Sequence, residues 1–412
     1  MEIKKKTIWM VYPYGPVHGE KGKACRYTQF GNELANNGYS VVWWTANFSH
    51  GDKVFRSDDW KDIQVSESFV TRLVPTKAYK NNISLRRIAF EKAFSYNLNK
   101  GFLKNKKPDL IITAGTGMFN AFRPCWPYAK KNNIPIIYDI MDISLIDTYM
   151  REHHKLLAPL AKVAMLFERK REHGFFKGIS GICALGKNQL EYAKHRAFGR
   201  DIPTSLVYNG IEVERLRSMK DSNEWSKLVP NKDKGWRWCV FAGSLGPSYD
   251  IETIIKCAKI CEEKEEKVLF IIAGNGPQAE LVKEASKKCT NIVFLGQIEL
   301  TTLFSIYRHC DIGLCAFASY STVDMPDKFY DYCAAGLASV NSLNGEVKEY
   351  IEKNSLGMQY IAGDPNSMYR SIHGLNGDKL DECKQNAYEI GGQFDIVVQV
   401  EKLSQMVEII LS

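Results

Sequence analysis

The stretch of sequence that decides the fold is MPDKFYDYCAAGLASV, residues 325–340. It predicts a helix that ends in a left-handed turn at Gly336 and leads directly into an apolar strand. Lys328 and Asp331 are three residues apart, so they lie on one face of that helix. The lysine could balance the charge of a diphosphate, and the carboxylate could accept hydrogen bonds from a ribose diol. An ordinary charge pair on a solvent-exposed helix has the same spacing, so this stretch alone leaves both interpretations open.

Two glycine turns upstream favour the ligand-binding interpretation. Residues 240–250, VFAGSLGPSYD, predict a buried strand, a glycine turn and the start of a helix, and residues 268–277, VLFIIAGNGP, repeat the pattern. Further short apolar strands are predicted at 292–296 and 311–314. Strands and helices that alternate in this way predict one half of a doubly wound α/β sheet. Ligands bind such sheets at the carboxyl ends of the strands, where these turns and Lys328 would meet.

The first half of the chain predicts a second doubly wound domain. A helix from about residue 24 to residue 36 follows the first strand and its glycine-containing loop. That loop contains no Gly-x-Gly-x-x-Gly, so a dinucleotide-binding domain is not supported. The strands are predicted at 7–12, 41–44, 109–113, 134–138 and 179–184.

With these motifs the chain resembles the retaining glycosyltransferases of family four, which have the GT-B architecture. The resemblance covers nearly the whole chain and rests on the two glycine turns, the helix around Asp331 and the turn at residues 208–211. It implies an α/β fold in which two doubly wound Rossmann-like domains face a cleft. The implied parts are an acceptor-side domain at 1–213, a nucleotide-sugar-binding domain at 214–395, and a C-terminal helix at 396–412 that packs back on the first domain.

The chain departs from the family pattern at four positions. Ser244 stands where the family has an arginine, Tyr249 where it has a lysine, and Val323 where it has the first of two glutamates. Asp331 stands where it has the second glutamate. Because a diphosphate without positive charge nearby would be poorly compensated, another cation must replace the two missing ones, and Lys328 is the best placed.

The helix also resembles one branch of the family in particular. Pro326, Lys328, Asp331 and Tyr332 match a Pro-x-Lys-x-x-acid-Tyr pattern of aminosugar transferases that act in surface-polysaccharide assembly. The implied donor-binding residues come from the two turns, the loop after a strand, and this helix. They are Gly243, Ser244, Leu245, Gly274, Asn275, Gly276, Ile298, Lys328 and Asp331.

The first domain has two candidate regions of its own. Gly15, Gly22 and Arg26 resemble an acceptor-side or phosphate-binding loop, although Arg26 would also fit a solvated first turn of a helix. Asp139 and Asp142 follow the fourth predicted strand and match a Glu-x-x-Asp pattern of the aminosugar-transferase branch. A carboxylate there could position an acceptor hydroxyl or take its proton. Aspartates that only cap a loop are common and give the alternative interpretation.

Composition narrows the class of protein. The chain has 412 residues, 45% apolar and 25% charged, which can form two substantial cores. Its net charge of +8 comes from dispersed residues without interleaved aromatic side chains, which argues against nucleic-acid binding. No metal spacing occurs among its 11 cysteines, and no Asp-x-Asp lies between a strand and a loop. We therefore expect reduced thiols, no metal, and no cofactor other than the donor substrate.

The expected location is the cytoplasm. The opening residues MEIKKK lead into a strand too short for the apolar core of a signal peptide, and no later apolar run can span a bilayer. Residues 157–171 predict a helix with an apolar stripe, and Lys155, Lys162 and Arg169 recur every seven residues along its flank. Such a helix can lie on an anionic leaflet, which would place the protein at the inner face of the plasma membrane. The alternative interpretation is that it packs into the core of the first domain with its lysines solvated.

The resemblance implies a retaining, metal-independent glycosyltransferase, of the hexosyl or N-acetylhexosaminyl type. It would move a sugar from a nucleotide diphosphate donor, expected to be a UDP-sugar, to a glycan or polyprenyl-linked acceptor. Two alternatives stay open at this point. One is a nucleotide-sugar 2-epimerase of the same fold, and the other is a non-catalytic protein that binds sugar nucleotides or glycans, which the missing arginine, lysine and glutamate favour.

Overall fold

The structure is a computed structural model that describes residues 5–20, 25–82, 84–114, 122–141, 170, 172–222, 224–321 and 323–412. Its internal contacts divide the chain into two compact units. The N-terminal unit comprises Met1–Tyr208 and Gln399–Ser412, and the C-terminal unit comprises Asn209–Val398. The boundaries expected from the sequence, after residues 213 and 395, lie a few residues from these.

The N-terminal unit is built on an eight-stranded sheet with the order β3-β4-β2-β1-β5-β6-β7-β8. All neighbouring strands are parallel except β3, which runs antiparallel to β4. The sequence does not predict β3, because most of its side chains are exposed and it has no apolar run. The strands are β1 (Thr7–Val11), β2 (Ser40–Ala46), β3 (Lys61–Ser66), β4 (Phe69–Val74), β5 (Leu110–Ala114), β6 (Ile136–Ile140), β7 (Gly181–Ala184) and β8 (Thr204–Leu206).

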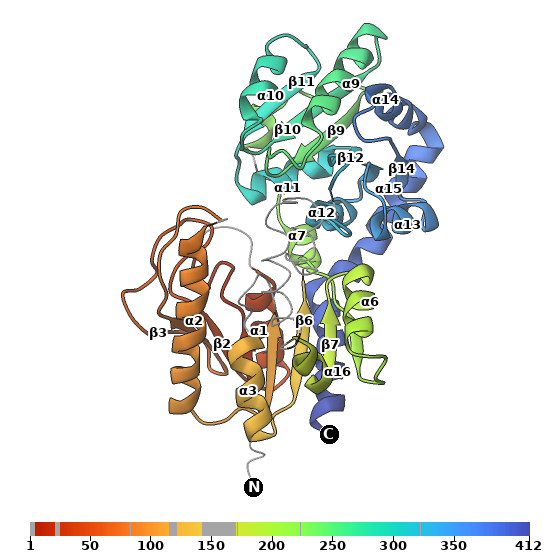
Figure 1. Cartoon of the computed structure of the whole chain (residues 1–412). Coiled ribbons are helices and arrows are strands. Elements are labelled where there is room, and N and C mark those ends of the chain that lie inside the picture. Colours follow the sequence, from red (N-terminus) through yellow and green to blue (C-terminus); the bar gives the residue numbers. More distant parts are fainter. Residues whose placement is uncertain are drawn as a thin grey trace, which may run out of the picture. The chain divides into compact units, whose positions relative to one another are not determined.

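Helices cover this sheet, and α2 and α3 lie side by side on the face toward the viewer (Figure 1). Aromatic side chains fill the space beneath them: the rings of Trp9 and Phe102 stack with centroids 4.7 Å apart, and Trp44 meets Trp9 edge-on at 5.0 Å. Their large apolar area supplies much of the core of this unit. The labelled helices are α1 (Arg26–Asn36), α2 (Leu85–Lys104), α3 (Phe122–Asn132), α6 (Lys187–Arg196) and most of α16 (Ile396–Leu411), and residues 172–178 are also helical.

The C-terminal unit contains a six-stranded, fully parallel sheet with the order β11-β10-β9-β12-β13-β14. The chain builds outward from β9 in one direction and from β12 in the other. The carboxyl ends of these two strands therefore flank the switch point at which such sheets bind ligands. The strands are β9 (Arg237–Ala242), β10 (Val268–Ala273), β11 (Ile292–Gly296), β12 (Ile312–Cys315), β13 (Ala338–Asn341) and β14 (Gly357–Gln359).

The helix predicted from residues 325–340 is confirmed as α12. It spans Asp327–Ala335, ends at Gly336 in the left-handed conformation with φ 71°, and is followed by β13. The other helices of the unit are α7 (Val213–Ser218), α8 (Trp225–Leu228), α9 (Ile251–Glu263), α10 (Ala279–Ser286), α11 (Leu300–His309), α13 (Glu346–Lys353), α14 (Pro365–Gly374), α15 (Gly377–Gly391) and the 3₁₀ turn η1 (Gly392–Phe394). The predicted α/β class with two Rossmann-like sheets is confirmed.

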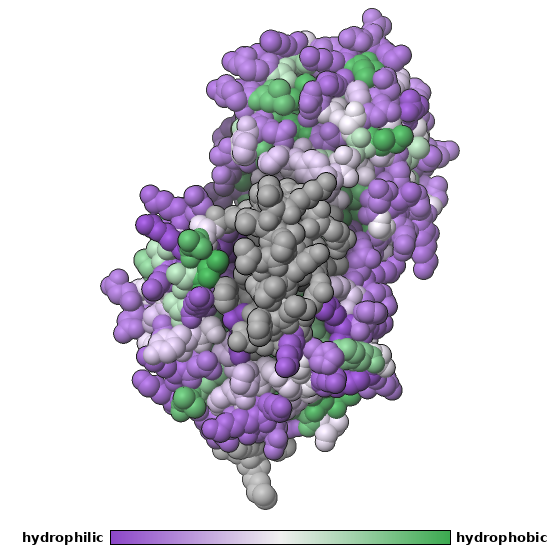
Figure 2. All heavy atoms as spheres, in the orientation of Figure 1, coloured by the Kyte–Doolittle hydropathy of each residue, from purple (hydrophilic) through white to green (hydrophobic). Residues whose placement is uncertain are grey.

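The visible surface of the described residues is mostly hydrophilic, with apolar side chains in small separate groups (Figure 2). Within the described ranges, no helix combines the length and the apolar character needed to cross a membrane.

Candidate functional site

The two predicted glycine turns pack against each other at the carboxyl ends of β9 and β10. Gly243 and Gly274 both have φ 141°, and the amide of Leu245 donates to the carbonyl of Asn275 at 2.9 Å. A Cβ atom on Gly274 would lie 1.8 Å from the carbonyl oxygen of Gly243. Only glycine fits there, because both the backbone angle and the close approach exclude a side chain.

Lys328 projects from the first turn of α12 toward the Gly243 turn. A Cβ atom placed on Gly243 would lie 3.7 Å from Nζ of Lys328. Three rings surround this ammonium group, with centroids 3.7 Å away for Phe241, 4.0 Å for Tyr249 and 5.0 Å for Phe317. We call these three rings the Lys328 cage. The aromatic faces attract a cation, and each such contact contributes about 0.5–2 kcal/mol.

The cage does not satisfy the hydrogen-bonding capacity of Lys328. The residue is 7% exposed, and Nζ donates no hydrogen bond to any residue that the structure describes. Burial lowers the pKa of Lys328 to about 7, although Cys315 and Asp331 act in the opposite direction. A buried amine without a partner is costly. An anion that reached the Gly243 turn would supply the missing partner.

The N-terminus of α12 adds to this preference for an anion. The N-cap is Pro326, whose side chain has no acceptor for the first amides of the helix. The amide of Phe329 donates to the carbonyl of Pro326 at 2.9 Å, and the remaining amides of the first turn favour negative charge. The carboxylate of Asp327 faces Asn209 instead, whose Nδ2 donates to it at 2.7 Å. Asp331 lies one turn further along the helix and is half-buried.

The other predicted donor-binding residues lie at the same edge of the sheet. Ser244 and Asn275 are exposed, and the half-buried Ile298 lies in the turn between β11 and α11. The structure thus brings both glycine turns and Lys328 together. The cage could not be read from the sequence, because its rings come from β9, the turn after it and the segment after β12.

In the N-terminal unit, Arg26 and Asp139 form a buried ion pair. Nε of Arg26 donates to one carboxylate oxygen of Asp139 at 3.1 Å and Nη2 to the other at 3.0 Å, and Nη1 donates to the carbonyl of Tyr208 at 2.8 Å. Arg26 is 6% exposed and Asp139 is not exposed at all. We therefore assign this pair to the packing of α1 against β6, and we do not carry either residue into the proposed site.

The remaining predictions for this unit differ in their outcome. Gly15 has φ 98°, and its carbonyl accepts a hydrogen bond from Arg56 at 2.8 Å, so it has a place in the packing of its loop. Gly22, Asp142 and the basic helix at 157–171, apart from residue 170, lie outside the described residues. No group of three histidine, cysteine, aspartate or glutamate side chains suited to a metal ion occurs in the described ranges.

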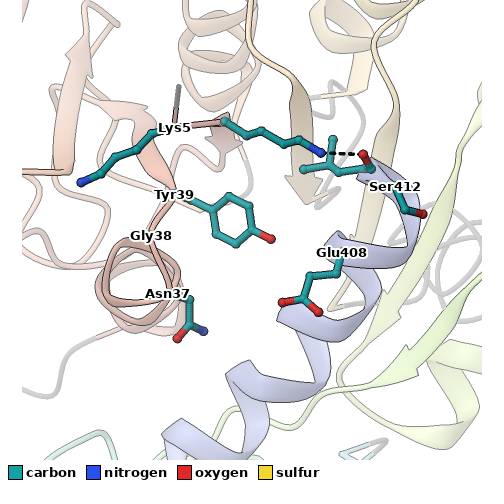
Figure 3. A pocket seen from close by; sticks show the side chains of 8 residues that line it. Lys5, Asn37, Gly38, Tyr39, Glu408 and Ser412 are labelled. Carbon is teal, nitrogen blue, oxygen red and sulfur yellow. Dashed lines mark hydrogen bonds between the residues drawn. The ribbon is translucent and has the colours of Figure 1, made fainter. Parts of the chain in front are cut away.

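A shallow pocket of about 570 Å³ lies elsewhere in the N-terminal unit (Figure 3). The side chains of Tyr39 and Glu408 point toward the same space, and Nζ of Lys6 donates to the carbonyl of Leu411 at 2.6 Å. Its lining residues are Lys5, Lys6, Asn37, Gly38, Tyr39, Glu408, Leu411 and Ser412. Lys5 and Lys6 precede β1, and Asn37, Gly38 and Tyr39 precede β2, so the pocket lies at the amino ends of these strands. This edge is opposite the one that binds ligands in doubly wound sheets.

Comparison with known proteins agrees with the geometry. Residues 237–378 match the protein family described as Glycosyl transferases group 1. No curated protein matches the chain in sequence. Among solved structures, sucrose-phosphate synthase from Thermosynechococcus elongatus is 16% identical, with a TM-score of 0.71, and the alignment covers 98% of this chain and 100% of that one.

Two further structures give the same picture. The Anabaena protein HepE in complex with UDP is 15% identical, with a TM-score of 0.65 over 98% of this chain and 99% of that one. WaaG, a glycosyltransferase involved in lipopolysaccharide biosynthesis, is 14% identical, with a TM-score of 0.66 over 97% and 99%. At these identities the likeness concerns the fold. Residues 237–378 thus match the family described as glycosyl transferases group 1, and the chain as a whole has the GT-B fold.

Proposed function

We propose that this protein is a retaining, metal-independent glycosyltransferase that takes a sugar from a nucleotide diphosphate donor, with a UDP-sugar as the expected donor. The acceptor is a glycan or a polyprenyl-linked molecule of surface-polysaccharide assembly. The observation that carries the proposal is the unpartnered ammonium group of Lys328, which lies beside two interlocked glycine turns at the switch point of the C-terminal sheet. HepE, which shares the fold, has been crystallised with UDP and with UDP-glucose, and this supports the choice of base.

In the proposed complex the diphosphate lies over the glycine turns. The amides of Ser244 and Asn275 and those at the start of α12 face its oxygens, because the amides of Gly243, Leu245, Gly274 and Gly276 already donate to oxygens of the protein. Lys328 provides the positive charge. Asp331 accepts hydrogen bonds from the ribose, and Ile298 contacts the base. Tyr249 occupies the position at which related enzymes have a lysine, yet its ring lies only 4.0 Å from Nζ of Lys328. The cation is thus supplied from α12 and reaches the place where the usual lysine is absent.

The first test of this proposal is the choice of nucleotide. A ligand that binds only the folded protein raises its stability, by about 2.7 kcal/mol at a concentration 100 times its Kd. We expect UDP to raise the melting temperature more than GDP, ADP or dTDP at equal concentration. A protein that responds to none of the four would contradict the proposal.

Replacing Lys328 by methionine should weaken the binding of UDP by about 1.5–3 kcal/mol, the range for a hydrogen bond to a charged group. The binding of uridine should stay the same, because uridine lacks the diphosphate. Methionine fills a similar volume within the aromatic cage, so the fold should persist. Calorimetric titration with both ligands measures the effect, and Lys256→Met on the exposed face of α9 is the control for a lost positive charge. An equal loss for UDP and uridine would show that Lys328 does not act on the diphosphate.

The affinity for UDP should fall as the pH rises from 7 to 9. The pKa of Lys328 is about 7 in the empty protein, and a bound diphosphate favours its charged form, so binding requires a proton that is increasingly absent above pH 7. The loss approaches about tenfold per pH unit when the bound form stays protonated. Burial raises the pKa of Tyr249 and raises that of Cys315 to about 12, so neither neighbour becomes charged in this window. Isothermal titration at several pH values should give this slope for the wild type and a flat profile for Lys328→Met.

Val323, 41% exposed where related enzymes have a glutamate, favours a second candidate, a protein that binds sugar nucleotides without transferring the sugar. A nucleotide-sugar 2-epimerase is the other alternative. Incubation with a UDP-sugar, followed by NMR, distinguishes the three. Release of UDP that depends on an added acceptor supports transfer, a new C2 epimer supports the epimerase, and an unchanged ligand that nevertheless binds supports the binding protein.

A further inference from the structure

A second group of polar side chains lies at the carboxyl-end edge of the N-terminal sheet. It is formed by His50 and Lys53, which follow β2, by Asn82, which lies between β4 and α2, and by Arg87 in the first turn of α2. We call these four residues the Lys53–Arg87 cluster. The sequence does not single it out, because its members belong to separate segments and match no spacing motif. Its edge of the sheet is the one at which this architecture binds ligands.

The two cations of the cluster converge on one residue. Nζ of Lys53 donates to Oδ1 of Asn82 at 2.7 Å, and Nη1 of Arg87 donates to the carbonyl oxygen of the same asparagine at 3.0 Å. The ammonium group of Lys53 also lies 4.5 Å from the centroid of the Tyr79 ring, and His50 bonds to the hydroxyl of Tyr79 through Nδ1. Contacts within the cluster therefore orient both cations toward Asn82.

The acidic groups around the cluster already have partners. Glu91 is 6% exposed, accepts a hydrogen bond from Tyr14 at 2.9 Å and lies 3.5 Å from Nε of Arg87. Asp52 accepts from Ser49 at 2.8 Å, and Glu20 pairs with Arg56 at 2.7 Å. Among the contacts of the described residues, Glu91 is thus the only carboxylate that offsets the charge of Arg87. No carboxylate forms an ion pair with Lys53 in that part of the chain.

The titration behaviour of the cluster is consistent with excess positive charge. Burial, then Lys53 and Arg87, lower the pKa of His50 to about 4. Burial and then the charge of Arg87 lower the pKa of Lys53. In addition, α2 is 20 residues long and has no acidic residue in its first turn, although carboxylates are favoured there. Each cation would be stabilised by an anion placed between them.

We propose that the Lys53–Arg87 cluster binds a phosphate group carried by the acceptor substrate. The site would be a phosphate subsite with the ammonium of Lys53 on one side, the guanidinium of Arg87 on the other, and the rings of Tyr14 and Tyr79 as its floor. The assignment of the phosphate to an acceptor rests on the proposed glycosyl transfer. The binding of a phosphate at this cluster does not depend on that proposal. The phosphate could be attached to a lipid or to a sugar, and Lys53 and Arg87 would recognise the phosphate group in the same way in both cases.

The test uses the full chain with its donor site saturated by UDP, so that only a second phosphate site is titrated. Inorganic diphosphate is the first probe, and Lys53→Asn is the variant. Lys53 has a left-handed backbone with φ 60°, which asparagine tolerates, but the shorter side chain cannot reach Asn82. Lys107→Asn, an exposed loop lysine before β5 at the opposite edge of the sheet, is the control for the same change of charge.

We expect diphosphate to bind the wild type with a Kd below about 1 mM, to bind Lys53→Asn about tenfold more weakly, and to bind Lys107→Asn within about twofold of the wild type. Geranyl phosphate and glucose 6-phosphate then distinguish the sources. Tighter binding of the first indicates a lipid-linked acceptor, and tighter binding of the second indicates a sugar phosphate.

Two results would overturn the inference. One is a wild type that does not bind diphosphate once UDP is bound, and the other is an equal loss in Lys53→Asn and Lys107→Asn, which would indicate unspecific attraction to the whole surface. Neither result would contradict the proposed binding of the donor nucleotide. If instead UDP fails to bind in the first step, the proposed function fails, and the comparison of the two lysine variants still decides whether the cluster binds phosphate.

Discussion

Asp139→Asn should lower the free energy of unfolding of the N-terminal unit by about 3–5 kcal/mol, the cost of removing one partner from a buried ion pair. The substitution leaves the guanidinium of Arg26 with no counter-charge at a position that is 6% exposed. Arg26 cannot avoid this cost by losing its proton, because guanidinium groups stay charged in proteins. Denaturant unfolding followed by tryptophan fluorescence measures the loss, since Trp9 and Trp44 are buried in this unit.

The chain offers a control with the same bonding and a different environment. Arg72 donates to both carboxylate oxygens of Asp62, at 2.7 and 2.6 Å, but the side chain of Asp62 is 48% exposed. Because exposed ion pairs contribute about 0–1 kcal/mol, Asp62→Asn should have a small effect. The double variant Arg26→Met with Asp139→Asn should lose less stability than the sum of the single variants. A similarly small loss for Asp139→Asn and Asp62→Asn would mean that Asp139 does not act through its buried charge.

The features that the sequence predicts correctly depend on local chemistry. The end of α12 follows from Gly336, which adopts φ 71°, and the Gly243 and Gly274 turns follow from glycines after buried apolar strands. Each depends on a few consecutive residues, so periodicity and turn preferences are sufficient to locate them. The parallel sheets follow in turn from the alternation of strands and helices.

The features that the sequence does not reveal depend on contacts between distant segments. Asp139 is 113 residues from Arg26, and nothing near either residue shows that its charge is already balanced. The spacing of Lys328 and Asp331 suggests a charge pair or a ligand site, but the aromatic cage appears only when the segments around β9 and β12 come together. Long-range packing therefore decides which polar residues are free to bind a ligand.

Gly274→Ala should lower the free energy of unfolding of the C-terminal unit by about 3 kcal/mol and should sharply reduce UDP binding. Two costs add up. A φ of 141° is unfavourable for any residue with a side chain, by about 1–2 kcal/mol, and a forced contact in a packed region costs about 1–3 kcal/mol. The contact is severe because the new Cβ would lie 1.8 Å from the carbonyl oxygen of Gly243, which is backbone and has no rotamer to escape into.

The clash, and not the backbone angle alone, should account for the loss of binding. Gly363 also has a positive φ, 83°, but a Cβ atom there would meet nothing within 4 Å. Gly363→Ala should therefore lose only the smaller conformational cost and should keep the affinity for UDP. Because the added methyl group pushes the Gly274 turn away from the Gly243 turn, it would disturb the packing beside Lys328 without changing any charged residue. If Gly274→Ala unfolds like Gly363→Ala and binds UDP as tightly, the two turns do not need the close contact that defines the proposed diphosphate site.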